Sequence, residues 1–83
     1  MKNIKAINIG KTLSDKLLSA GINSIEELKS TGSENAFIMI KTIDPSACLN
    51  MLYALEGAIR DIRWHDLEVS RKKELKDFFN ILK

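Results

Sequence analysis

The chain has 83 residues, of which 45% are hydrophobic and 29% are charged, and its formal net charge is +2. This length and composition predict a single globular domain over residues 1–83. A domain of this size buries only about 60% of its unfolded surface, so little apolar surface is left to enclose a ligand cavity. The sequence has no apolar run near the roughly 18 residues of a membrane span and no secretion signal, so a cytoplasmic protein is expected.

The cysteine and histidine content argues against a structural metal. A single Cys48 and a single His65 exclude an internal disulfide and a four-ligand zinc site, and neither a metal nor a cofactor is expected. Cys48 lies in an apolar run between Ala47 and Leu49, where a free cysteine is usually a small buried hydrophobe. We therefore expect Cys48 in the core rather than as a reactive thiol.

A glycine turn followed by a short amphipathic helix is predicted near the N-terminus. The helix is expected from about Lys11 to Ser19, with Gly21 as the left-handed residue just past its end. Asn8 is the first residue of the turn, and asparagine is the non-glycine residue that best tolerates a left-handed backbone. A helix that begins at such a turn points unpaired N–H groups outward, and these groups can bind an anion such as phosphate.

The same turn resembles the second half of a helix-hairpin-helix nucleic-acid motif, in which Gly-hydrophobic-Gly forms the hairpin and a small residue follows four places later. Ile9, Gly10 and Ser14 match this pattern, and Asn8 stands where the first glycine would be. The residues expected to contact phosphate are Asn8, Gly10, Lys11, Thr12 and Lys16. The alternative is an ordinary surface helix start, because only Met1–Ala6 could form the preceding helix of a complete motif.

Two further helices are predicted before residue 44. Ser24 and Glu27 indicate a capping box at the start of a second helix that ends near Thr31. Ser33 is expected to cap a third helix through about Thr42. The outer side of that helix leaves Ile38 and Met39 partly exposed, which would mark a protein interface if they belong to one patch.

The fourth helix is predicted to be the buried centre of the fold. Asp44 as the cap and Pro45 at the first helical position predict a helix over about Ser46 to Ile62. Apolar residues occur on nearly every side of it, which is typical of a central helix. A narrow stripe is expected to reach water: Asn50, Tyr53, Gly57 and Arg60. Glu56 and Arg60 are spaced to form an i, i+4 ion pair.

The last helix, from roughly Glu68 to Leu82, is amphipathic. Its predicted apolar face comprises Leu75, Phe78, Phe79 and Leu82. Its basic face is a second candidate for nucleic-acid binding and comprises Arg71, Lys72, Lys73, Lys76 and Lys83. Glu74 and Asp77 are interspersed among these cations, which also fits a solvated face. No run predicts a strand, so the expected fold is all-α, with five helices around the fourth.

Catalytic residues are scarce in this sequence. His65-Asp66 is the only acid-base pair that contains a histidine, and no serine or cysteine carries a local sign of activation. We expect Trp64 to pack against the core and His65 and Asp66 to make turn hydrogen bonds. The protein is therefore not expected to be an enzyme. Tyr53 and Trp64 remain candidates for protein contact.

Residues 44–59 and 62–67 resemble the C-terminal domain of the TfoX (Sxy) competence regulators, as do Asn8–Lys11, Ala20–Ile22 and Glu26–Leu28. The resemblance covers about Ile4 to Leu82. It implies a bacterial protein linked to natural transformation and a small helical fold similar to helix-hairpin-helix and SAM-like domains. It also implies a free-standing copy, because those regulators carry an N-terminal domain ahead of this one. Glu68 stands where the family usually has proline.

Two hypotheses follow from the sequence. The leading one is a non-enzymatic accessory domain in transcription or DNA handling that binds DNA weakly and without sequence preference through the glycine turn. The alternative is a protein-interaction module that docks on another regulatory protein or self-associates as a homo-oligomer.

Overall fold

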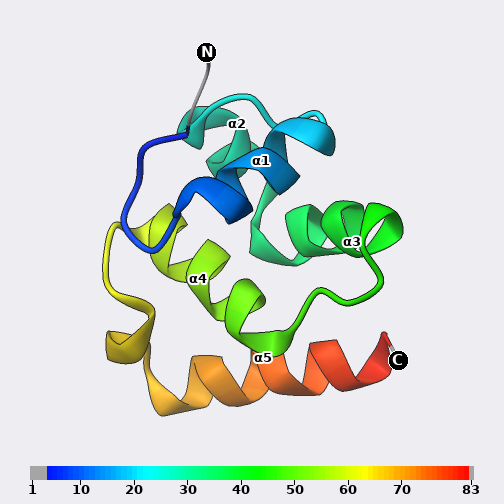
Figure 1. Ribbon diagram of the computed structural model, residues 1–83. Coiled ribbons are helices and arrows are strands. Elements are labelled where there is room, and N and C mark those ends of the chain that lie inside the picture. The colour runs from blue at the N-terminus through cyan, green and yellow to red at the C-terminus, as the bar shows by residue number, and fades with distance from the viewer. Residues whose placement is uncertain (1–3, 83) are drawn as a thin grey trace.

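The computed structural model describes residues 4–82, and this part of the chain is all-α, as predicted (Figure 1). Its elements are α1 (Lys11–Ser19), α2 (Ile25–Thr31), α3 (Ser33–Ile43), α4 (Leu49–Arg60), the 3₁₀-helix η1 (Trp64–Asp66) and α5 (Val69–Ile81). Lys83 of the predicted basic face lies outside the described residues. No helix within residues 4–82 is long and apolar enough to cross a membrane.

Helix α4 lies at the centre of the fold, as its apolar surface predicts. It contacts α2, α3, η1 and α5. In Figure 1 it runs between α1, α2 and α3 on one side and α5 on the other. Leu52 and Leu55 of α4 have no exposed surface, and Ala58 is 2% exposed. A helix that is apolar on most sides is stable only when other elements cover it, and here they do.

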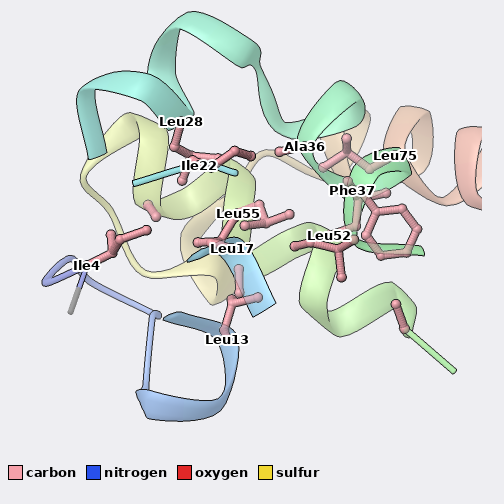
Figure 2. Packing of buried hydrophobic residues seen from close by; sticks show 14 of the residues in the cluster. Ile4, Leu13, Leu17, Ile22, Leu28, Ala36, Phe37, Leu52, Leu55 and Leu75 are labelled. Carbon is pink, nitrogen blue, oxygen red and sulfur yellow. The ribbon is translucent and has the colours of Figure 1, made fainter. Parts of the chain in front are cut away.

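The hydrophobic core joins residues from all five α-helices and from the segment before α1 (Figure 2). Its fully buried side chains include Leu17, Leu28, Phe37, Ile40, Leu52, Leu55 and Leu75. Phe37 also packs against Phe79 of α5, with ring centroids 5.8 Å apart. Burial of each large aliphatic or aromatic side chain contributes about 1.5–3 kcal/mol, so this cluster is the main stabilising element.

The segment before α1 packs on α1 without forming a helix. Ile4 is 4% exposed, and its N–H donates a 2.9 Å hydrogen bond to Oγ of the buried Ser14. Ala6 and Ile9 form an isolated antiparallel bridge. No helix precedes α1 within residues 4–82. The small residue of the helix-hairpin-helix pattern therefore accommodates an extended segment rather than a partner helix.

The predicted boundaries of α1 and α2 are confirmed. Gly21 follows α1 with a φ of 91°. Ser24 Oγ accepts a 3.1 Å hydrogen bond from the Glu27 N–H. The Glu27 carboxylate accepts from the Asn23 N–H at 3.0 Å, whereas a standard capping box uses the N–H of the cap residue, here Ser24. Both boundaries are set by neighbours in the sequence, which is why local patterns predict them.

The predicted starts of α3 and α4 are wrong. Ser33 is the first residue of α3 and not its cap, and its hydroxyl donates to Glu56 at 2.6 Å. Helix α4 begins at Leu49, three residues after the predicted start, and ends at Arg60. Asp44 Oδ1 accepts hydrogen bonds from the Ser46 N–H and hydroxyl instead. The carboxylate therefore closes a local turn and does not cap a helix.

Two further predictions for α4 are wrong. Arg60 does not pair with Glu56 but makes two hydrogen bonds to Glu68, at 2.6 and 2.8 Å. Glu56 instead accepts hydrogen bonds from Arg71 of α5 at 3.1 and 3.2 Å. Gly57 was expected to reach water but is buried. Burial opposes ionisation of Glu56, yet the hydrogen bonds from Arg71 and Ser33 outweigh it and lower the pKa of this carboxyl.

Candidate nucleic-acid interface

The predicted turn before α1 is present, and its left-handed residue is Asn8, with a φ of 70°. The Ile9 N–H donates to the Ala6 carbonyl at 3.1 Å and closes the turn. Gly10 is the N-cap of α1 and has a φ of −88°, so its backbone does not require glycine. Asn8, rather than Gly10, therefore supplies the unusual backbone conformation of this turn.

The side chain of Asn8 ties the turn to the far end of α4. Its Nδ2 donates to the Ile62 carbonyl at 2.8 Å, and its Oδ1 accepts from the Trp64 N–H at 3.3 Å. The amide lies directly over Gly57, where a Cβ would collide with it. Asn8 was predicted to contact phosphate, but both polar atoms of its side chain are already engaged within the protein. These two hydrogen bonds hold the turn in its position.

Two helix N-termini border one surface depression beside this turn. The depression has a volume of about 390 Å³, and its lining includes Gly10, Lys11 and Thr12 at the start of α1 together with Cys48 and Asn50 at the start of α4. Neither helix has a side-chain cap or an acidic residue in its first turn. Both helix starts therefore have unpaired N–H groups and a partial positive charge, and residues of both starts line this depression.

Cys48 is exposed as the N-cap residue of α4, so the expectation that it lies in the core is wrong. Ala47 takes the buried position and is 2% exposed. Because α4 begins at Leu49 and not at Ser46, it is Ala47 rather than Cys48 that faces the core.

We expect the Cys48 thiol to react under native conditions because the thiol is exposed. Titration of the folded chain with a chromogenic disulfide reagent should give one thiol per chain, at a rate close to that of the urea-unfolded chain. A reaction more than about a hundredfold slower in the folded state would mean that the thiol is buried.

Ion pairs partly neutralise the lysines around the turn. Lys11 Nζ lies 3.2 Å from Asp15, although its side chain remains 77% exposed. Lys16 makes a close ion pair with Asp44, which lowers the pKa of that carboxyl to about 2, with a further contribution from Ser46. Lys5 and Thr12 are exposed. The free positive character of the site therefore comes from the exposed head of Lys11 and from the two helix starts, and Lys5 lines a neighbouring hollow together with Gly10 and Lys11.

Most cations of the predicted basic face on α5 are engaged within the protein. Arg71 pairs with Glu56, Glu74 and Glu34, at 3.1, 3.1 and 3.7 Å. Lys73 pairs with Asp77 at 3.0 Å. Lys72 donates to the His65 carbonyl and lies 5.7 Å from the centre of the Trp64 ring. Lys76 has no ion pair with residues 4–82. This face resembles a solvated helix surface more than a phosphate-binding one.

Tyr53 and Trp64 form a half-buried stack instead of an exposed patch. Their ring centroids are 5.7 Å apart, and His65 stacks on Trp64 at 3.9 Å. As predicted, Trp64 packs against the core. The Asp66 N–H makes a turn hydrogen bond to the Arg63 carbonyl at 2.9 Å. Among the residues the structure describes, no group of three or more His, Cys, Asp or Glu side chains could hold a metal ion.

Fold and site together define a small all-α domain whose N-terminal turn is locked onto its central helix. The chain belongs to the TfoX C-terminal domain family, which matches residues 1–79. This family is a competence-related family of regulatory type. The all-α fold and the family thus agree with the resemblance seen in the sequence.

Two crystal structures of proteins from Listeria monocytogenes have the same fold. One is of an uncharacterized protein in a triclinic form, which is 49% identical with a TM-score of 0.93 and is matched over 94% of this chain and 89% of that chain. The other is of a protein of unknown function in a tetragonal form, which is 48% identical with a TM-score of 0.93 over 95% and 98%. A comparison with curated proteins finds no match.

Proposed function

We propose that this domain is a regulatory accessory that binds the phosphate backbone of DNA weakly and without sequence preference, at the depression between the starts of α1 and α4. The main support is that two uncapped helix N-termini without acidic first turns border one depression. Backbone N–H groups, a hydroxyl and a lysine are the groups that proteins use to contact phosphates.

The expected affinity is low because few free charges are available. Lys11 is exposed but forms an ion pair with Asp15, and Lys16 forms an ion pair with Asp44. Such a site fits two to four phosphate contacts. In competence-related regulation, the domain would then add a weak DNA contact without sequence preference to the regulatory complex that contains it.

Salt dependence tests the proposal directly. Binding of a labelled duplex measured by fluorescence anisotropy should weaken with salt, with a log-log slope of about −2 to −4. Lys11→Glu should weaken binding to all sequences alike and reduce the magnitude of the slope by about 1. An absence of binding at low salt would refute the proposal.

Lys76→Glu is the matched control, because it makes the same charge change on α5, which lies on the opposite side of α4 from α1 (Figure 1). This variant should bind almost as well as the parent chain. DNA should also slow the reaction of Cys48 with thiol reagents, since Cys48 lines the depression. Loss of binding in Lys76→Glu but not in Lys11→Glu would move the interface to α5 and contradict the proposal.

A further inference from the structure

Three stacked aromatic rings adjoin the turn before α1. The Tyr53 ring of α4 stacks on the Trp64 ring of η1, and the Trp64 ring stacks on that of His65. The Trp64 N–H also donates to Asn8 Oδ1, so the turn and the stacked rings are joined directly. Tyr53, Trp64 and His65 are called the aromatic ladder below.

His65 is the ring of the aromatic ladder that is open to solvent. Tyr53 and Trp64 are half-buried and pack against the hydrophobic core, whereas His65 is exposed and does not belong to that cluster. Lys72 Nζ lies 5.7 Å from the centre of the Trp64 ring and takes up a further part of its surface. Within residues 4–82, no hydrogen bond engages the imidazole of His65. The imidazole is therefore positioned by stacking, and a further flat group can add to it.

The aromatic ladder and the depression share one face of α4. Asn50, Tyr53 and Gly57 have the i, i+3, i+7 spacing of a single helix face. Asn50 lines the depression, and Tyr53 begins the ladder about 4.5 Å further along the helix axis. Each strand of a duplex advances about 3.4 Å per nucleotide, so a strand with a phosphate in the depression reaches the ladder with its next one or two nucleotides.

The charges beside the aromatic ladder suit a neutral group better than a phosphate. Asp61, Arg63 and Asp66 are exposed, and none of them has an ion pair within the described part of the chain. Two carboxylates against one guanidinium do not attract an anion. A nucleobase carries no charge, and aromatic side chains next to a backbone-binding groove are what proteins use to bind the bases of single strands.

We propose that the ligand of this site is single-stranded DNA, with its phosphates at the depression and one base stacked on His65. A base inside a duplex is stacked between its neighbours, so only a single strand offers a free base face for this contact. This inference rests on the proposed function, because the phosphate contacts hold the strand beside the ladder. His65 then determines the preference for single strands and contacts no phosphate.

Three labelled probes of equal length test the inference by fluorescence anisotropy with the full chain: oligothymidylate, an abasic strand with the same phosphates, and a duplex. Oligothymidylate should bind about fivefold more tightly than the abasic strand, which is the effect of stacking one base. His65→Ala should make the two affinities equal, and His65→Phe should keep the difference. The salt slope should be the same in all three chains, because His65 contacts no phosphate.

Ile81→Ala is the matched control, since it removes a side chain that is 79% exposed on α5. This variant should keep the preference for oligothymidylate, and thermal unfolding followed by circular dichroism checks that each variant is folded. Lys11→Glu should weaken the binding of all three probes and leave the ratio between oligothymidylate and the abasic strand unchanged.

Equal binding of oligothymidylate and the abasic strand by the parent chain would refute stacking on His65, as would a preference that survives in His65→Ala. An Ile81→Ala effect as large as that of His65→Ala would refute it as well. In each of these cases binding of the abasic strand and the duplex would leave the phosphate site of the proposed function intact. Failure of all three probes to bind at low salt would refute both.

Discussion

Gly57→Ala is expected to destabilise the protein by about 2–3 kcal/mol, although alanine normally stabilises a helix interior relative to glycine. Gly57 lies in the middle of α4, and a Cβ there would collide with Asn8 Nδ2 and lie 2.7 Å from the Ile62 carbonyl oxygen. The carbonyl belongs to the backbone and the Asn8 amide is held by two hydrogen bonds, so neither can move away without breaking contacts. Urea unfolding followed by circular dichroism measures the change.

Gly10→Ala is the matched control for this prediction. No atom lies within 4 Å of a Cβ at Gly10, and its φ of −88° is accessible to alanine. The free energy of unfolding should therefore change by less than about 0.5 kcal/mol. Adding Asn8→Gly to Gly57→Ala should recover part of the loss, because glycine keeps the φ of 70° and removes the colliding amide. A Gly57→Ala variant as stable as the parent would contradict the close approach of the turn to α4.

The sequence predicts those parts of the fold that depend on neighbouring residues. The end of α1 follows from Gly21, whose positive φ terminates the helix. The start of α2 follows from Ser24, whose side chain accepts a hydrogen bond from within its own first turn. The apolar pattern of α4 predicts its central position, because a helix with few polar positions has to be covered. Each of these inferences needs only local geometry or a periodicity.

The wrong predictions depend on contacts between distant segments. Ser33 and Ser24 are both plausible caps by sequence, but Ser33 is drawn to Glu56, 23 residues away. Glu56 and Arg60 are correctly spaced for a pair, yet each finds a better partner on or beside α5. An exposed i, i+4 pair contributes only about 0.3–0.5 kcal/mol, so a tertiary partner readily displaces it.

Asn8 shows how a residue can be predicted correctly in conformation and incompletely in function. Its positive φ follows from its place in a glycine pattern, and the structure confirms it. Its side-chain contacts with Ile62 and Trp64 span more than 50 residues, and no local pattern predicts them. One signal was present: a glycine inside a helical pattern, here Gly57, often marks a close approach by another segment.

Phe37→Ala is expected to destabilise the protein by about 3–5 kcal/mol. Phe37 has no exposed surface, lies in the core beside Leu52 and Leu75 in Figure 2, and packs against the Phe79 ring. Removing the ring leaves a cavity at the point where α3 and α5 meet, and α5 lies against the rest of the fold mainly through α4. Thermal and urea unfolding give the change in stability.

Because small domains lie near the lower end of the usual 5–15 kcal/mol of stability, Phe37→Ala should be close to unfolded at 37 °C. Ile81→Ala removes an aliphatic side chain that is 79% exposed on the same helix as Phe79, and it should change stability by less than about 0.5 kcal/mol. Phe37→Leu should fall between the two, since it keeps most of the buried apolar area but not the ring contact. A loss below about 1 kcal/mol for Phe37→Ala would mean that α3 and α5 can close over the cavity, and would contradict the rigid packing on which the position of α5 depends.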